Sequence, residues 1–198
     1  MLKNPTKHEV DKTTVLFIRH GDRIVVPGEE RGVGLITPGP SLNERGKKQA
    51  KDVAKKLSKL KNQIDLLYCS DMTRAIETAQ EISKKIGKKP VIIKELSEIG
   101  HDLWKKKIYT RDFWKHYLKH RDSIKALDQI LDKNKGKFIV IVAHGNLIKG
   151  LIFKKLGLSL RQIGFFHHHN CSISSARFSG RKLDHINFFN SKEITLGD

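Results

Sequence analysis

The sequence is poor in cysteine. Its two cysteines, Cys69 and Cys171, lie far apart and form no Cys-x-x-Cys pair, so a reduced cytoplasmic protein is a simpler interpretation than a disulfide between them. No stretch approaches the roughly 20 apolar residues of a membrane-spanning helix. Residues 1–5 contain a lysine but no apolar segment typical of a secretory signal. We therefore expect a cytoplasmic protein without a membrane span.

Acidic residues are scarce relative to basic ones. The chain has 21 Asp and Glu against 39 Lys and Arg, which gives a formal net charge of +18. Such a field attracts anions, and nucleic acid is one class of anionic partner. The lysines recur along the expected helices instead of forming one basic block interleaved with aromatic residues, which favours a solvated lysine-rich surface. The expected partner is an anionic phosphorylated substrate, nucleic acid is a less favoured alternative, and the oligomeric state is left open.

The chain of 198 residues is 38% apolar and 30% charged, which fits one folded domain. We expect a flexible N-terminal tail over 1–12 and a single domain over 13–198. Apolar segments rich in β-branched residues alternate with segments of helical spacing. Strands are expected at 13–18, 65–69, 91–93 and 138–142. Helices are expected at 44–57, 72–86 and 146–156, with one or two helices over 113–131 and a hairpin at 172–189. This order predicts an α/β fold, a three-layer α/β/α sandwich with a mostly parallel central sheet and the hairpin at its edge.

Local signals place the ends of two helices. Asn43 is expected to cap the first helix, and Ser70 or Asp71 the second, which should end near Gly87. Residues 22–42 are rich in glycine and proline, which predicts a long surface loop.

Charged and polar residues follow four of the expected strands. The triplet Arg19-His20-Gly21 directly follows the first strand, and the pair His144-Gly145 follows the fourth. Arg74 lies at the start of the helix after the second strand, and Glu98 lies in the irregular segment after the third. Ligands of open α/β sheets bind at the carboxyl ends of the strands. We therefore expect these junctions to converge on one anion-binding pocket.

The residue types fit phosphoryl transfer through a histidine. A neutral His20 is a good nucleophile toward phosphorus and becomes a phosphoramidate. Arg19 and Arg74 can hold the equatorial phosphate oxygens, and a protonated His144 adds a further donor. A protonated Glu98 can give its proton to the departing alkoxide and later take one from water. Because two arginines and an imidazolium replace a metal's charge, we expect neither a metal nor a cofactor.

Six segments in order resemble the histidine phosphatase superfamily, the branch that contains cofactor-dependent phosphoglycerate mutase and related phosphatases. The segments are LFIRHG (16–21), LNERGKKQA (42–50), YCSDMTRAIETA (68–79), LSE (96–98), VAHGN (142–146) and NCSI (170–173). The resemblance implies a phosphoglycerate mutase-like fold with His20 as the phosphorylated nucleophile. It also implies that phosphate is bound by Arg19, His20, Arg74, His144 and Gly145, and that Glu98 is the acid.

The chain departs from the family pattern beside the nucleophile and after the acid. Asp22 follows the RHG triplet where many members have Glu, and no asparagine before Asn43 matches the one that contacts phosphate. The segment Gly100–Trp104 matches only in part a Gly-x-Trp-Glu-Gly type segment. The acid therefore has alternatives, namely Glu95, Asp102 and, more distantly, Asp22.

Three functions remain for this set of residues. A phosphatase that hydrolyses phosphate monoesters through a phosphohistidine on His20 is favoured, because family mutases have a large insertion between the acid and the second histidine. The interval from Glu98 to His144 is short in this chain. A phosphoglycerate mutase-type phosphotransferase is the alternative, and an inactive anion- or nucleic-acid-binding module on the same scaffold is the third.

The run His167–His169 and two tryptophans stand outside this assignment. Consecutive residues point in different directions, so a polar rim or a capping segment is favoured over a metal site. Trp104 and Trp114 either line a substrate pocket or cover the core.

Overall fold

The computed structural model describes residues 12–25, 38–100 and 111–194 of the chain. The expected N-terminal tail lies outside these residues, except that Lys12 is already the first residue of strand β1 (Lys12–Arg19). Much of the expected loop over 22–42 lies outside them as well, although its two ends are paired through Arg23 and Leu42. In the part of the chain that is described, no helix is long and apolar enough to cross a membrane.

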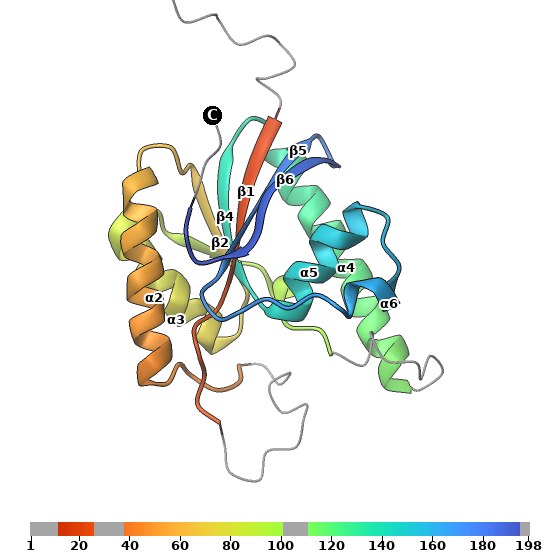
Figure 1. The fold of residues 1–198 in the computed structure, drawn as a ribbon, viewed down its shortest axis with the longest axis horizontal. Helices are drawn as coiled ribbons and strands as arrows, with labels where there is room; N and C mark the ends of the chain where they lie inside the picture. The colour runs from red at the N-terminus through yellow and green to blue at the C-terminus, as the bar shows by residue number, and fades with distance from the viewer. Residues whose placement is uncertain (1–11, 26–37, 101–110, 195–198) are drawn as a thin grey trace, which may run out of the picture.

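Six strands form one sheet within the described ranges (Figure 1). Besides β1, they are β2 (Leu66–Cys69), β3 (Pro90–Ile92), β4 (Phe138–Ala143), β5 (Ile173–Ser179) and β6 (Lys182–Ser191). The spatial order is β3-β2-β4-β1-β5-β6. The first four of these strands are parallel to one another, and the β5–β6 hairpin adds antiparallel strands at one edge. The expected mostly parallel sheet with an edge hairpin is confirmed.

Helices cover both faces of this sheet (Figure 1). One face is covered by α2 (Glu44–Leu57) and α3 (Thr73–Ile86), with the 3-10 turn η2 (Ser58–Leu60) after α2. The other face is covered by α4 (Arg111–Lys133) and α5 (Gly145–Lys155), and the short α6 (Leu160–Ile163) lies beside α5. The turn η3 (Lys94–Leu96) follows β3. This is the expected α/β/α sandwich.

One expected cap is present and the other is not. Asn43 caps α2, because its side-chain oxygen accepts a hydrogen bond from the Gly46 N–H at 2.8 Å. Neither Ser70 nor Asp71 caps α3, whose N-cap position is Met72. The Ser70 hydroxyl contacts His144 and accepts from the Met72 N–H at 3.2 Å, which is the N–H of the N-cap residue itself, and the Asp71 carboxylate accepts from Ser97.

The strand that ends at the triplet is held from both sides. Val15 and Phe17 join the apolar layer under α4 and α5, whereas Leu16 and Ile18 join the layer under α2 and α3. All four are fully buried, and each contributes about 1.5–3 kcal/mol of transfer free energy. The residues at the end of β1 are therefore presented by a rigid element.

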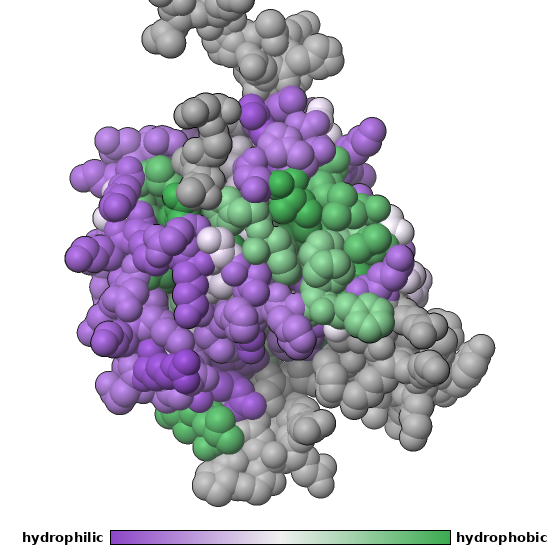
Figure 2. Space-filling model, in the orientation of Figure 1, coloured by the Kyte–Doolittle hydropathy of each residue, from purple (hydrophilic) through white to green (hydrophobic). Residues whose placement is uncertain are grey.

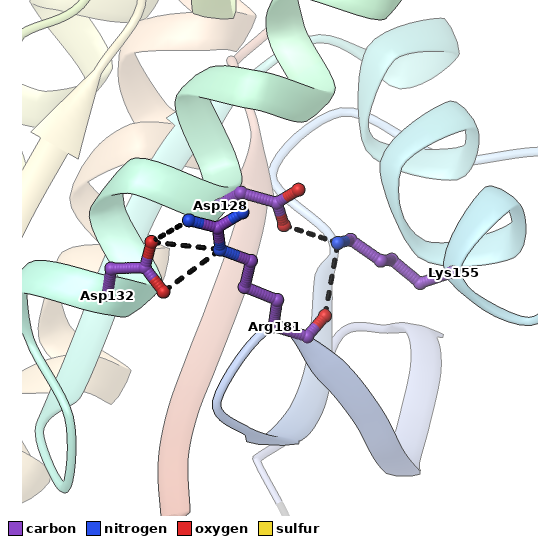
Figure 3. A network of polar contacts seen from close by, with 4 residues as sticks. All are labelled: Asp128, Asp132, Lys155 and Arg181. Carbon is purple, nitrogen blue, oxygen red and sulfur yellow. Dashed lines mark hydrogen bonds and ion pairs between the residues drawn. The ribbon is translucent and has the colours of Figure 1, made fainter.

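The turn of the edge hairpin is tied to the helical layer (Figure 3). The Arg181 guanidinium contacts the Asp132 carboxylate of α4 through Nε at 2.9 Å and Nη2 at 2.5 Å. Lys155 of α5 donates to the Arg181 carbonyl at 3.0 Å and forms an ion pair with Asp128. This network fixes the β5–β6 turn against α4 and α5.

Candidate active site

The five chemically active residues expected from the sequence lie together at the carboxyl ends of the parallel strands. Arg74 Nε donates to His20 Nε2 at 3.0 Å, and the rings of His20 and His144 have centroids 5.0 Å apart. The charges of Arg19 and Arg74 both act on the carboxyl group of Glu98. Two strand ends, one helix start and the segment after η3 thus supply one cluster.

The ring of His20 has a defined tautomer. Its Nδ1 lies 2.6 Å from the Gly21 carbonyl oxygen, which can only accept, so Nδ1 carries the proton and donates. The lone pair therefore stays on Nε2, where the Arg74 Nε–H donates to it. Burial and the neighbouring charges of Arg74 and Arg19 hold the pKa of His20 well below its ordinary value. The ring is neutral and its Nε2 is able to act as a nucleophile.

Two glycines bring the start of α2 against the His20 turn. A Cβ on Gly21 would lie 2.5 Å from the Gly46 carbonyl oxygen, and a Cβ on Gly46 would lie 1.9 Å from the Asp22 carbonyl oxygen. The Gly21 N–H also donates to Thr78 of α3 at 3.1 Å. Only glycine permits this approach, which explains the glycines of the RHG and LNERG segments.

Arg19 and Gly145 are packed against each other. A Cβ on Gly145 would lie 3.2 Å from Arg19 Nε, so glycine leaves room for the guanidinium. Arg19 Nη1 donates to the His168 carbonyl at 2.5 Å, while its buried Nε has no hydrogen-bond partner among the described residues. A buried donor without a protein partner is available to an anion.

His144 is fully buried, and its Nε2 lies 2.8 Å from the Ser70 hydroxyl. Its Nδ1 has no hydrogen-bond partner in the described part of the chain. Burial, the neighbouring His20 ring and the charge of Arg74 hold the pKa of His144 well below its ordinary value. This imidazole is therefore neutral.

Glu98 has the environment of a proton donor. Burial raises the pKa of its carboxyl group above the ordinary value, against the opposing effect of Arg19 and Arg74. Its Oε1 accepts from the N–H groups of Ile99 at 3.0 Å and Leu147 at 3.2 Å, which fix the side chain beside the start of α5.

The alternative acids differ from Glu98 in position. Glu95 is exposed on η3. Asp22 accepts from the Arg23 N–H and from the Asn43 amide, which ties its carboxylate to the loop ends before α2. Asp102 lies outside the described residues, as do the side chains of Trp104 and Trp114.

The histidine run does not form a uniform rim. His167 and His169 are exposed as expected, but His168 is only 4% exposed, because its ring lies between the hydroxyls of Ser172 and Ser174. No group of three or more His, Cys, Asp or Glu that could hold a metal occurs within the described ranges.

Three supporting residues were not expected from the sequence. Ser70 contacts His144, the His168 carbonyl holds Arg19, and Asn170 donates to the His20 carbonyl at 3.0 Å. The only sequence signal for Asn170 was its place in the NCSI segment. Nothing in the sequence next to Ser70 or His168 indicates which distant residue each of them contacts.

Comparison with known proteins agrees with this geometry. The model of the histidine phosphatase superfamily (branch 1) matches residues 15–190. The chain is 30% identical to phosphoglycerate mutase-like protein 4 of Arabidopsis thaliana, over 72% of this chain and 71% of that protein. It is 28% identical to phosphoserine phosphatase 1 of Hydrogenobacter thermophilus, over 85% of this chain and 88% of that protein.

Solved structures share the fold. A phosphoserine phosphatase of Entamoeba histolytica in complex with 3-phosphoglyceric acid superposes with a TM-score of 0.65 at 25% identity, over 90% of this chain and 97% of that one. A structure described as mycobacterial hydrolase 2 superposes with a TM-score of 0.73 at 19% identity, over 93% of each chain.

Proposed function

Because this chain belongs to branch 1 of the histidine phosphatase superfamily, we propose that it hydrolyses phosphate monoesters through a phosphohistidine on His20. The observation that carries the proposal is the tautomer of His20. Its Nδ1–H is held by the Gly21 carbonyl, so the Nε2 lone pair faces the cluster of cations and the second imidazole. A neutral imidazole oriented in this way is the nucleophile that the reaction requires.

In the first step, His20 Nε2 attacks phosphorus and the bond to the ester oxygen breaks. Glu98 gives its proton to the departing alkoxide, which leaves as an alcohol. Arg19 and Arg74 bind the phosphoryl oxygens and stabilise the charge that spreads over them. When a phosphate enters, the Arg74 Nε–H donates to a phosphate oxygen in place of His20 Nε2, which frees the lone pair.

In the second step, the Glu98 carboxylate takes a proton from water. The resulting hydroxide attacks the phosphohistidine, the P–N bond breaks, and inorganic phosphate and neutral His20 are regenerated. The raised pKa of Glu98 suits both steps, because the group must give up and regain one proton near neutral pH.

His144 is proposed as a phosphate donor through Nδ1. The charges of Arg74 and Arg19, which lower the pKa of His144, are offset when a dianionic phosphoryl group binds beside them. Phosphate binding therefore favours the protonated imidazole, which adds a positive charge as the transition state forms.

Hydrolysis is favoured over transfer between phosphoglycerates by the short interval from Glu98 to His144. Proteins named as phosphatases are among its relatives, including phosphoserine phosphatase 1 and the Pgam5 serine/threonine-protein phosphatase of Drosophila ananassae. The net charge of +18 favours a substrate that carries anionic charge beyond the transferred phosphate. We place this activity in the cytoplasm, since both cysteines are free thiols.

The test is a release assay for inorganic phosphate over a panel of phosphoserine, 3-phosphoglycerate, sugar phosphates, nucleotides and a phosphopeptide. The wild-type protein is compared with His20→Ala and with His167→Ala, an exposed control in the histidine run. We expect hydrolysis by the wild type and the control, and a loss of at least about 1,000-fold in His20→Ala.

Two results would redirect the proposal. Transfer of phosphate between phosphoglycerates without net release indicates the mutase. Retention on nucleic acid at physiological salt, with ester hydrolysis that is the same in His20→Ala, indicates an anion-binding module instead.

A further inference from the structure

The segment between α6 and β5 forms hydrogen bonds to both Arg19 and His20. The His168 carbonyl accepts from Arg19 Nη1 at 2.5 Å. Two residues further on, Asn170 donates through its amide to the His20 carbonyl at 3.0 Å, and the Cys171 N–H donates to the Arg19 carbonyl at 3.0 Å. This segment therefore bonds the backbone of both residues and the side chain of one of them.

The ring of His168 is held by a chain of hydrogen bonds in which the donor and the acceptor of each bond are determined. Ser172 uses its hydroxyl proton on the His169 carbonyl at 2.7 Å, so its oxygen accepts from His168 Nδ1–H at 2.8 Å. On the other side, the Asn190 N–H donates to the Ser174 hydroxyl at 2.9 Å. That hydroxyl donates its own proton to His168 Nε2 at 2.8 Å. The chain is complete only with a neutral ring.

The surroundings keep the ring neutral. Burial and the charge of Arg19 lower the pKa of His168 to about 3. The ring also stands edge-on to Phe189, with centroids 5.3 Å apart. The serines lie at the start of the edge hairpin, and the hairpin's far end is fixed by the Arg181–Asp132 contact (Figure 3).

Arg19 needs a fixed acceptor to set the direction of its guanidinium. Burial lowers the pKa of Arg19, against the opposing effects of Glu98 and Asp22, so the group is charged and largely removed from water. A buried guanidinium needs hydrogen-bond acceptors in place of water, and its planar donors take the orientation that a fixed acceptor imposes. The His168 carbonyl is that acceptor, and its bond leaves Arg19 Nε turned toward Gly145 and without a partner among the described residues.

We propose that His168 is a positioning residue for Arg19. Its ring, locked between the hydroxyls of Ser172 and Ser174, fixes the backbone carbonyl that orients the Arg19 guanidinium for phosphate. His168 acts only through Arg19. The proposal rests on the proposed function, in which Arg19 binds the phosphoryl group.

A double-mutant cycle tests it, with kcat/KM for p-nitrophenyl phosphate as the readout. His168→Leu is compared with the parent in the wild-type background and in the Arg19→Ala background. We expect a fall of about 10- to 100-fold in the wild-type background, since a displacement near 1 Å has that effect. In the Arg19→Ala background we expect a change of less than about 2-fold, because the residue that His168 orients is gone.

Three further variants complete the design. His168→Gln keeps one donor and one acceptor, so it should recover most of the activity lost in His168→Leu. His167→Leu, an apolar substitution at the exposed neighbour, should leave kcat/KM unchanged. The pair Ser172→Ala and Ser174→Ala breaks the same chain without changing His168. These serine substitutions should lower kcat/KM in the wild-type background but not in the Arg19→Ala background. They replace His168→Leu in the experiment if that variant does not fold.

The outcomes separate the two proposals. An equal fall in kcat/KM in both backgrounds means that His168 acts on stability or on another residue, and overturns the inference while leaving the proposed function intact. Wild-type activity in Arg19→Ala contradicts phosphate binding by Arg19. In that case both the role of Arg19 in the proposed function and its positioning by His168 are overturned.

Discussion

Replacing Gly46 by alanine should damage the active site without touching a catalytic group. A Cβ at this position would lie 1.9 Å from the Asp22 carbonyl oxygen, and a separation below 3.0 Å forces something to move. The Asp22 backbone must therefore shift by roughly 1 Å, and it is two residues from His20. Alanine also favours a helix over glycine by about 1 kcal/mol, which offsets part of the cost of overpacking, about 1–3 kcal/mol.

The structure thus predicts a small loss of stability and a large loss of rate. We expect Gly46→Ala to lose up to about 2 kcal/mol of unfolding free energy in urea, and about 100-fold in kcat/KM. Gly87→Ala is the matched control. Gly87 ends α3 at a φ of 71°, and nothing lies within 4 Å of an added Cβ. The Gly87→Ala variant should therefore lose about 1 kcal/mol of unfolding free energy and keep the wild-type kcat/KM. A Gly46→Ala protein with wild-type kcat/KM would refute the close approach of α2 to the His20 turn.

Two further predictions follow from the titrating groups. The Glu98→Gln variant cannot protonate an alkoxide, so its hydrolysis of an alkyl phosphate should fall by about 100- to 10,000-fold. With p-nitrophenyl phosphate, whose leaving group needs no proton, it should still give a burst of p-nitrophenol. Equal losses in the release of the alkyl alcohol and of p-nitrophenol would contradict the role of Glu98 as the acid. The pKa values of His20, His144 and His168 are all lowered by burial, so the unfolded chain binds protons below about pH 6.5 that the folded chain does not. The contribution of these three neutral histidines to stability is fully present above that pH. The free energy of unfolding should therefore fall from pH 7.5 to pH 5, by up to about 1.4 kcal/mol per pH unit for each histidine. A rise in the free energy of unfolding as the pH falls over this range would show that these rings are protonated in the folded state.

The sequence was a good guide wherever a signal was local or repeated. The apolar runs before Arg19 and His144 predicted strands whose carboxyl ends meet, and the register of β1 and β4 places Arg19 opposite Ala143, directly before His144. Asn43 lies one residue before α2 and caps it, as its side chain and position indicate.

The supporting contacts were not predictable in this way. The cap expected at Ser70 or Asp71 was wrong, because Ser70 meets His144 and Asp71 meets Ser97, both far away in the chain. His168 lies in a run of histidines that is typical of a protein surface. Its ring is held by Ser172, directly before β5, and by Ser174 in β5, and these serines face it only after the hairpin has folded. Local propensity carries no information about such partners.

The most direct test of the account is to trap the phosphorylated enzyme. Glu98→Gln is mixed with p-nitrophenyl phosphate, quenched in alkali, where phosphoramidates survive, and analysed by peptide mass spectrometry. We expect one added phosphoryl group on the peptide that contains His20, and none in the Glu98→Gln, His20→Ala double variant. A phosphoryl group on another residue, or hydrolysis without any phosphorylated enzyme, would contradict nucleophilic catalysis by His20.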